Sequence, residues 1–532
     1  MSSIYGIFGG SHDPSVCLIL DGKIQYCVEE ERMNRIKSGD NHPEVPRLSL
    51  RRIEKESNIS VKEADYVVFS DHVPIPFAQG LERDYTSYDH HLCHATSVYY
   101  TSGFQDKCLV LTMDAGGNAD SINLYTAEKG EMTKVFSDYY AEGGNLPMIW
   151  AYVTRSVKGL DSKGNFIWNL CKDEGKLMGM APDGEYDKKF DDFFKNIIDY
   201  KDWKFFPSNS LGKARFGTEK IRRLGWLETT KQISDFSYAL QNRTEKLMID
   251  FLNDIHEKYP DYKKICLAGG IFANVKLNQK INQLEWLDEI YVMPAMADNG
   301  LSLGAAILKT RELKEGFSVP EKLQDVYFGF DYTFEDLKKC IQGKPIHIEQ
   351  FDSTKVAQYI HDGDIIGWFQ GRMEFGPRAL GNRSIICKPD DIEVKNRLNG
   401  ILKRYDTMPF APVVMEEYFD EIFTETKSKY SAKFMTICYD TKEEWIEKLP
   451  SVIQKSDRTA RPQIIDKKTN GRYWEVINEY QKITNIPVLL NTSFNIHNEP
   501  IIEEPCRAVT HLINGSIDKL VFENYVLQFR EP

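Results

Sequence analysis

Short apolar runs alternate with helical patterns along the first three fifths of the chain. Residues 5–8 are typical of a strand, and the runs 16–20 and 24–28 flank Asp21-Gly22, a dipeptide favoured in hairpin turns. Residues 236–259 repeat apolar side chains at the helical period and predict a long amphipathic helix. Strands that alternate with helices in this way indicate an α/β fold.

Three of the predicted strands, among them those at 108–113 and 264–268, end in a pair of glycines. The pairs are Gly9-Gly10, Gly116-Gly117 and Gly269-Gly270. Glycine lets a backbone approach a ligand closely. We therefore expect these turns to surround one phosphate-containing ligand, although each turn alone is a weak signal because glycine after a strand is common.

The pattern changes near residues 315–350, where a mixed polar segment separates two stretches of α/β character. A chain of 532 residues is too long for one ordinary core, so two domains are expected. We place the first at residues 1–345 and the second at 346–532. Strands of the second domain are predicted at 365–369, 384–387 and 487–490.

Composition narrows the class of protein. Hydrophobic residues make up 42% of the chain and charged residues 27%, as in soluble globular proteins, and no apolar run is long enough to span a bilayer. A formal net charge of -12 disfavours bulk nucleic acid and anionic membranes as partners. No signal peptide is recognisable, and the ten cysteines form no CxxC pair, so we expect reduced, mostly buried thiols in a cytoplasmic protein.

The segment 371–384 holds three arginines, Arg372, Arg378 and Arg383, among three glycines and a proline. The planar guanidinium group suits phosphate and carboxylate oxygens, and glycine allows close backbone approach. This combination predicts an oxyanion-binding loop. A surface loop with solvated charges is the alternative.

A candidate metal site begins at residues 89–95. On a helix, His90 and His94 share one face and can bind one metal ion, while Asp114 and Asp298 offer carboxylates at strand ends. Two imidazoles with two carboxylates suit iron(II), manganese or zinc, and the sequence does not choose among them. A helix with incidental histidines is the alternative.

Together these segments resemble the O-carbamoyltransferase family of antibiotic and nodulation-factor biosynthesis, which includes the tobramycin, cephamycin and novobiocin carbamoyltransferases. The resemblance covers nearly the whole chain, with many motifs in the family's order. The matching segments are 6–15, 29–32, 90–95, 174–182, 268–274, 371–384, 457–463 and 489–495.

The resemblance implies an N-terminal domain of the actin-like, sugar-kinase-like ATPase fold and a C-terminal α/β domain similar to threonylcarbamoyl-adenylate synthase. In such enzymes carbamoyl phosphate and ATP give a carbamoyl-adenylate, with release of phosphate and pyrophosphate. The carbamoyl group then passes to a hydroxyl of the acceptor. The resemblance also implies Mg²⁺ with ATP, a divalent metal that is usually iron, and a homodimer.

Site residues follow by motif match. The expected metal ligands are His90, His94, Asp114 and Asp298. The expected nucleotide-binding residues are Lys176, Gly269, Gly270, Asn274 and Asn299. Arg461 and Ser493 match the carbamoyl-adenylate-forming site.

Chemistry adds further roles. Arg372, Arg378, Arg383 and Arg461 can neutralise the phosphates of ATP and carbamoyl phosphate, and Asn491 and Ser493 can donate hydrogen bonds to a carbamate or carbonyl oxygen. Transfer to a hydroxyl needs a general base, for which His12 and Asp13 are candidates. A histidine that only stabilises its turn is the alternative for His12.

Two positions depart from the family pattern. Met408 precedes Pro409 where arginine is usual, with Lys403 and Arg404 nearby, and Asn498 stands where glycine is usual. These changes indicate a distinct branch, so the acceptor is open. A hydroxyl of a sugar, antibiotic or other natural product is the first expectation, and a hydroxymethylated pyrimidine nucleotide or DNA base is the alternative.

Two other classes of function are weighed against this one. A tRNA threonylcarbamoyl-type modification enzyme is disfavoured by the acidic charge, and a non-enzymatic nucleotide-binding regulator by the metal and arginine motifs. Variable loops at 139–163 and 201–231 are expected to shape the acceptor pocket. The aromatic residues of the second loop either stack on the acceptor or, more ordinarily, form a small core: Trp203, Phe205, Phe206, Phe216 and Trp226.

Overall fold

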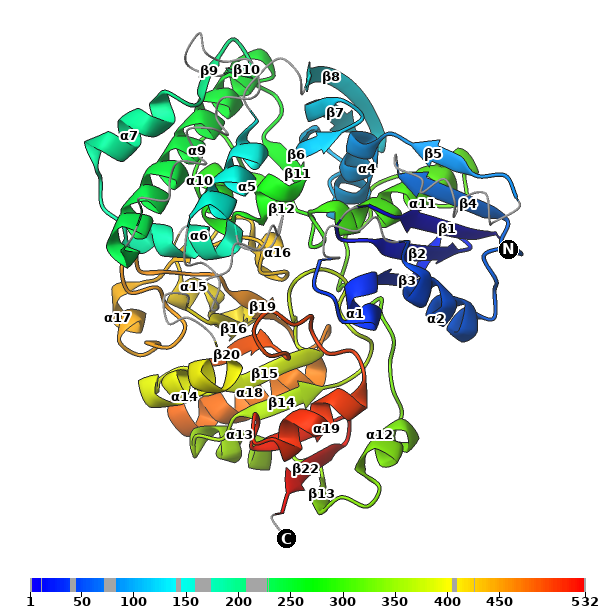
Figure 1. The fold of residues 1–532 in the computed structure, drawn as a ribbon, viewed down its shortest axis with the longest axis vertical. Coiled ribbons are helices and arrows are strands. Elements are labelled where there is room, and N and C mark those ends of the chain that lie inside the picture. Colours follow the sequence, from blue (N-terminus) through cyan, green and yellow to red (C-terminus); the bar gives the residue numbers. More distant parts are fainter. Residues whose placement is uncertain are drawn as a thin grey trace. The chain divides into compact units, whose positions relative to one another are not determined.

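The structure is a computed structural model with two compact units (Figure 1). One comprises Met1–Glu30 and Ser38–Leu323, and the other Glu31–Lys37 and Gln324–Pro532. The described residues are 2–10, 12–38, 45–70, 83–139, 145–157, 174–206, 227, 229–403, 409–424 and 426–530.

The first unit contains two five-stranded sheets with the same order and the same strand directions. One has the order β3-β2-β1-β4-β5 and the other β8-β7-β6-β11-β12. In each, the central strand pairs antiparallel with the second strand and parallel with the fourth. This duplicated α/β arrangement agrees with the actin-like ATPase fold that the resemblance implies. The strands are β1 (Ser3–Phe8), β2 (Ser15–Leu20), β3 (Lys23–Glu29), β4 (Tyr66–Ser70), β5 (Thr86–Tyr88), β6 (Cys108–Gly117), β7 (Asp120–Glu128), β8 (Glu131–Tyr139), β11 (Lys264–Ala268) and β12 (Glu289–Val292).

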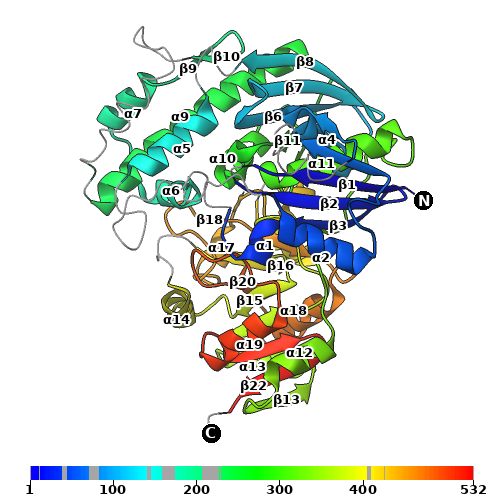
Figure 2. The same cartoon turned by 45° about the vertical axis from the view of Figure 1, so that its right-hand side comes forward.

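Two helices link these sheets and carry the site. Helices α4 (His90–Ser102) and α11 (Leu301–Glu312) pack against each other; α11 also packs on β1 and α4 on β6 (Figure 2). Gly304 permits the helix contact, since a Cβ there would lie 2.0 Å from the Cys93 carbonyl oxygen. The start of α11 is thereby held beside the first turns of α4.

The remaining elements of the first unit are mainly helices. Helix α9 agrees with the predicted amphipathic helix and begins at a capping box formed by Thr229 and Gln232. The elements are α1 (Glu30–Asn34), which runs into the second unit, α2 (Arg47–Ser57), α5 (Leu146–Ser156), α6 (Glu174–Met180), α7 (Lys188–Lys195), β9 (Asp199–Lys201), β10 (Lys204–Phe206), α9 (Thr230–Lys258) and α10 (Val275–Asn282).

The second unit is built on an eight-stranded mixed sheet with the order β13-β22-β21-β14-β15-β20-β16-β19. Its strands are β13 (Ile346–Gln350), β14 (Ile366–Phe369), β15 (Arg383–Cys387), β16 (Ala411–Met415), β19 (Gln463–Ile465), β20 (Val488–Ser493), β21 (Lys519–Phe522) and β22 (Tyr525–Phe529). A separate pair is β17 (Tyr439–Asp440) with β18 (Thr459–Ala460). The helices are α12 (Phe334–Ile341), α13 (Ser353–His361), α14 (Ile392–Leu402), α15 (Phe419–Ile422), α16 (Lys429–Ala432), α17 (Glu443–Ile446), α18 (Gly471–Thr484) and α19 (Pro505–Ile513).

The division between the units falls after Leu323, earlier than the change of pattern near residue 345 suggests. The reason is local pairing: Met373 N donates to Phe330 O at 3.1 Å, and Phe375 N to Val326 O at 2.8 Å. The polar connection therefore packs as part of the second unit.

One pair of cysteines differs from the prediction of reduced thiols. The sequence predicts reduced thiols throughout, but Cys340 and Cys506 form a disulfide between α12 and α19, with Cα atoms 4.9 Å apart. The other cysteines in the described ranges are buried. The two bonded residues are 166 positions apart, and only the packing of the two helices brings them together.

Candidate active-site groups

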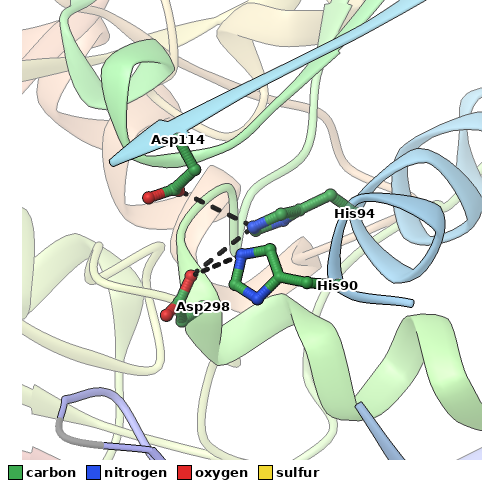
Figure 3. A group of neighbouring side chains, drawn as sticks. All are labelled: His90, His94, Asp114 and Asp298. Carbon is green, nitrogen blue, oxygen red and sulfur yellow. Dashed lines mark ion pairs between the residues drawn. The ribbon is translucent and has the colours of Figure 1, made fainter. Parts of the chain in front are cut away.

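The four expected metal ligands form one cluster in the first unit (Figure 3). His90 and His94 lie one turn apart on α4, whose start is capped by Asp89, and their rings face Asp114 on β6 and Asp298 in the turn before α11. His94 Nε2 lies 3.6 Å from Asp114 Oδ2 and 3.5 Å from Asp298 Oδ1, and His90 Nε2 lies 3.5 Å from Asp298 Oδ1. One potential ligand atom from each residue lies within 4.8 Å of the others.

The chemistry of this group fits a divalent metal. In the described part of the chain, His90 Nε2, His94 Nε2 and Asp298 Oδ1 are buried and have no hydrogen-bond partner. Burial lowers the pKa of His90 to about 3 and that of His94 to about 4, although the carboxylates act in the opposite direction. Both imidazoles are therefore neutral, the form that binds metal. Burial, and then the charge of Asp298, raises the pKa of Asp114, and a cation would relieve this strain.

Two neighbouring histidines have different places. His12 reaches the edge of the cluster, with Nε2 3.6 Å from Asp298 Oδ2 and Nδ1 3.2 Å from Asp13 Oδ2. Its side chain is 23% exposed, so it can meet a substrate. His91 instead points away from the cluster: its ring nitrogens lie 2.9 Å from Thr112 Oγ1 and 3.1 Å from Asp120 O.

A buried carboxylate that the sequence left unassigned supports the turn of Asp298. Glu29, at the end of β3, accepts a 3.2 Å hydrogen bond from Asn299 Nδ2. Ser15 Oγ donates to Asn299 O at 2.8 Å. The side chain of Asn299, expected to contact nucleotide, is thus directed at Glu29. In the sequence, Glu29 belongs to the run Glu29–Glu31, and such a run of charges is usually solvated, so it does not indicate this role.

The glycine pair after β11 contacts the carboxylate of Asp114 and the backbone of Met113 before it. Gly270 N donates to Asp114 Oδ2 at 2.6 Å. Gly269 has φ 109°, and a Cβ there would lie 2.1 Å from the Met113 carbonyl oxygen. Only glycine satisfies both the left-handed backbone and the close approach.

Another expected nucleotide-binding residue, Asn274, directly follows the 3-10 turn Gly270–Ala273. Asn274 caps α10 and exchanges two amide hydrogen bonds with Gln241 of α9, at 3.2 and 2.8 Å. Its amide is therefore occupied by the protein. Lys176 lies on α6, partly exposed.

The arginines of segment 371–384 divide into two groups. Arg383 is fully buried and donates to the carbonyl oxygens of Gln370, Gly371, Asn382 and Phe330 at 2.8–3.0 Å, with its guanidinium 3.6 Å from the Phe369 ring centre. Arg372 donates to Gly329 O at 2.8 Å and Phe328 O at 3.0 Å. Both side chains are bound to the backbone around the loop, which differs from the expectation that they face phosphate.

Arg378 and Arg461 form the second group. Burial lowers the pKa of both guanidinium groups, and the charge of Arg461 lowers that of Arg378 further. Among the described residues, neither forms an ion pair with a carboxylate, and the Nε atom of each is buried without a hydrogen-bond partner. Two neighbouring cations without a counter-ion are the electrostatic signature of an anion site.

Asn491 and Ser493 lie on the adjacent strand β20. Asn491 Nδ2 donates to Ala379 O at 3.1 Å, next to Arg378 in the chain, and to Gln463 Oε1 at 2.8 Å, two residues after Arg461. Ser493 pairs with Ser384 at the end of the arginine loop. The structure thus brings the expected carbamoyl-site residues of three separate motifs together.

A further residue, Glu374, organises this loop and was missed from the sequence. Its Oε1 accepts hydrogen bonds from the backbone N–H groups of Leu380, Asn382 and Arg383 at 2.7–3.1 Å. The carboxylate is 2% exposed. It fixes the backbone on both sides of Gly381, which has φ 98°.

The aromatic residues near the second variable loop favour the core interpretation. Trp203 packs at 5.5 Å from Phe136 and 6.2 Å from Phe251, and Phe205 lies 5.4 Å from Phe251. Phe206 ends strand β10. Phe216, Trp226, Arg404 and Met408, with most of the two variable loops, lie outside the described residues.

The Carbamoyltransferase N-terminus model matches residues 78–307 and the Carbamoyltransferase C-terminus model matches residues 357–528. The chain therefore belongs to the carbamoyltransferase family, and it is a carbamoyltransferase.

The chain is similar to two nodulation proteins over most of its length. The chain is 33% identical to nodulation protein NolNO of Sinorhizobium fredii, over 98% of this chain and 79% of that protein. It is 34% identical to nodulation protein NolO of Bradyrhizobium diazoefficiens, over 83% of this chain and 79% of that protein. Among solved structures, full-length HypF in its phosphate- and nucleotide-bound form covers 59% of this chain and 56% of its own, with 14% identity and a TM-score of 0.37. No helix in the described ranges is long and apolar enough to cross a membrane.

Proposed function

We propose that the protein is an ATP-dependent O-carbamoyltransferase that works through a carbamoyl-adenylate. The observation that carries this proposal is the pair Arg378 and Arg461, two cations without a carboxylate partner among the described residues. Carbamoyl phosphate and ATP repel each other, and paired guanidinium groups can hold both sets of phosphate oxygens. Arg372 and Arg383 hold the loop that presents Arg378.

The first half-reaction proceeds in two steps. Water cleaves carbamoyl phosphate to carbamate and phosphate. A carbamate oxygen then attacks the α-phosphorus of ATP, a C–O–P linkage forms, and pyrophosphate leaves. Arg378 and Arg461 neutralise the reacting anions, and Ser493 Oγ can donate to an oxygen of the carbamoyl group.

The second half-reaction transfers the carbamoyl group to an alcohol. The acceptor oxygen attacks the carbamoyl carbon, AMP leaves, and the acceptor proton passes to a base. We assign that role to His12, because its Nε2 lies 3.6 Å from Asp298 Oδ2 at the edge of the cluster. A divalent metal held by His90, His94, Asp114 and Asp298 would supply Lewis-acid polarisation, with iron(II) as the first expectation.

The acceptor is a hydroxyl of a sugar, antibiotic or other natural product. Mass spectrometry tests the proposal: purified protein with ATP, Mg²⁺, carbamoyl phosphate and a panel of sugars, aminoglycosides and hydroxymethylated nucleotides. We expect one compound of the panel to gain the mass of a CONH2 group in place of a hydrogen atom. This product should form only when ATP and carbamoyl phosphate are both present. Product formation without ATP would contradict the adenylate route.

A further inference from the structure

The buried amide of Asn491 has a fixed orientation in the second unit. Its side chain is 1% exposed, and Nδ2 donates to the carbonyl oxygen of Ala379 at 3.1 Å and to Gln463 Oε1 at 2.8 Å. A backbone carbonyl only accepts hydrogen bonds, so the NH2 end of Asn491 must face Ala379. Gln463 is fixed in the same way, because its Nε2 donates to Leu380 O at 2.8 Å.

The oxygen of this amide therefore faces away from both partners. Asn491 Oδ1 is buried and has no hydrogen-bond partner within the described part of the chain. An unpaired buried acceptor is unfavourable, and such atoms at binding sites are commonly paired by a ligand donor. The arrangement reverses the expectation that Asn491 donates to an oxygen of the substrate, because both of its N–H groups are already used.

The orientation of the Asn491 amide depends on the two segments that contain Arg378 and Arg461. Ala379 follows Arg378 directly, and Gln463 lies two residues beyond Arg461. The two partners that orient Asn491 thus belong to the same two segments that supply the unpaired guanidinium groups. These two segments thus carry donors for oxygen atoms in their arginines, and they orient one acceptor, the asparagine oxygen.

Carbamoyl phosphate presents only one kind of donor. Its phosphate and carbonyl oxygens accept hydrogen bonds, whereas its NH2 group donates them. We propose that Asn491 Oδ1 accepts a hydrogen bond from the carbamoyl NH2 group and selects this substrate over acyl phosphates that carry a methyl group there. This inference rests on the proposed function, since it assumes that the arginine site binds carbamoyl phosphate.

Acetyl phosphate provides the matched probe, because it replaces NH2 by CH3 and keeps every oxygen. A site that pairs a substrate N–H rejects the analogue that lacks it, because its buried acceptor is then left unpaired. The experiment measures the initial rate of pyrophosphate release from ATP with each acyl phosphate. The quantity compared is the ratio of the two kcat/KM values, which is insensitive to a general loss of activity.

The variants are Asn491→Leu and, as a control, Gln370→Leu. Gln370 is 7% exposed and fully paired: Nε2 donates to Asn470 Oδ1 at 2.5 Å, and Oε1 accepts from Arg472 at 3.3 Å. We expect Asn491→Leu to reduce the preference for carbamoyl phosphate by at least about tenfold. Gln370→Leu should lose stability and keep the wild-type ratio.

The results that would contradict the Asn491 inference differ from the result that would contradict the proposed function. A wild-type ratio in Asn491→Leu, or an equal fall in Gln370→Leu, would overturn the inference. If Asn491→Leu releases too little pyrophosphate to measure, the ratio of Kd values for the two phosphates by calorimetry replaces the rate ratio. No pyrophosphate release by the wild-type protein with carbamoyl phosphate would contradict the proposed function itself.

Discussion

Arg32 donates a hydrogen bond of 2.8 Å from its guanidinium to the carbonyl oxygen of Gly376. Arg32 is 3% exposed, and Gly376, with φ 115°, lies two residues before Arg378. The bond ties the short segment Glu31–Lys37 to the arginine loop within the second unit. We therefore expect Arg32 to position the loop that carries Arg378.

The first prediction concerns this bond. Arg32→Gln should raise the KM for carbamoyl phosphate by roughly tenfold, with a smaller change in kcat, because a misplaced Arg378 weakens binding. Steady-state pyrophosphate release measures both constants. Circular dichroism should show an intact fold, and an unchanged KM in a folded variant would show that Arg32 does not position the loop.

The second prediction compares a proposed metal ligand, His90, with its neighbour in the sequence, His91. His90→Ala should lose bound metal and carbamoyl transfer but retain pyrophosphate release, because the cluster lies in the first unit. His91→Asn is the matched control: His91 is buried on the same helix, but it contacts Thr112 and Asp120 O. Elemental analysis should find metal in the control and not in the variant. Equal metal in both would refute the ligand assignment.

The two groups of arginines should respond differently to substitution. Arg383→Met removes four hydrogen bonds to buried carbonyl oxygens, so the free energy of unfolding should fall by about 3 kcal/mol. Arg378→Met removes a partly buried cation that has no carboxylate partner among the described residues, so it should leave stability equal or higher, while abolishing pyrophosphate release. Urea unfolding distinguishes them. A stability loss in Arg378→Met as large as in Arg383→Met would contradict the division.

The stability of the second unit should depend on pH through His511. Burial, with the charges of Arg35 and Arg507, lowers the pKa of His511 to about 4 from 6.5. As the pH falls, the unfolded chain binds this proton first, so the stability is full above about pH 6.5 and declines toward pH 4. His511→Phe should remove a decline of about 3 kcal/mol, seen as the wild-type minus variant difference in urea unfolding. A difference independent of pH would refute it.

Many helices and strands were predictable, because an element that buries one face repeats apolar residues at a short, regular spacing. The strands expected at 108–113, 264–268 and 487–490 appear as β6, β11 and β20, and the long helix appears as α9. Strand order was not predictable. The repeated sheet topology and the inclusion of Glu31–Lys37 in the second unit depend on contacts between distant segments, which leave no local pattern.

The candidate sites show the same limit. The spacing of His90 and His94 predicts a shared helix face, and the structure brings the two expected carboxylates, Asp114 and Asp298, beside it. The arginine motif predicts which residue types the loop contains, but not where each side chain points. Arg383 and Arg378 look equivalent in the sequence, yet one is enclosed by carbonyl oxygens and the other is left unpaired in the described structure.

Pyrophosphate release tests the central claim most directly. Purified protein with ATP and Mg²⁺ should release pyrophosphate only when carbamoyl phosphate is added, and Arg461→Ala should lose this release while remaining folded. The wild-type protein would then carry the adenylate-forming site assigned to the paired arginines. Pyrophosphate release that does not depend on carbamoyl phosphate, or full activity in Arg461→Ala, would contradict the account.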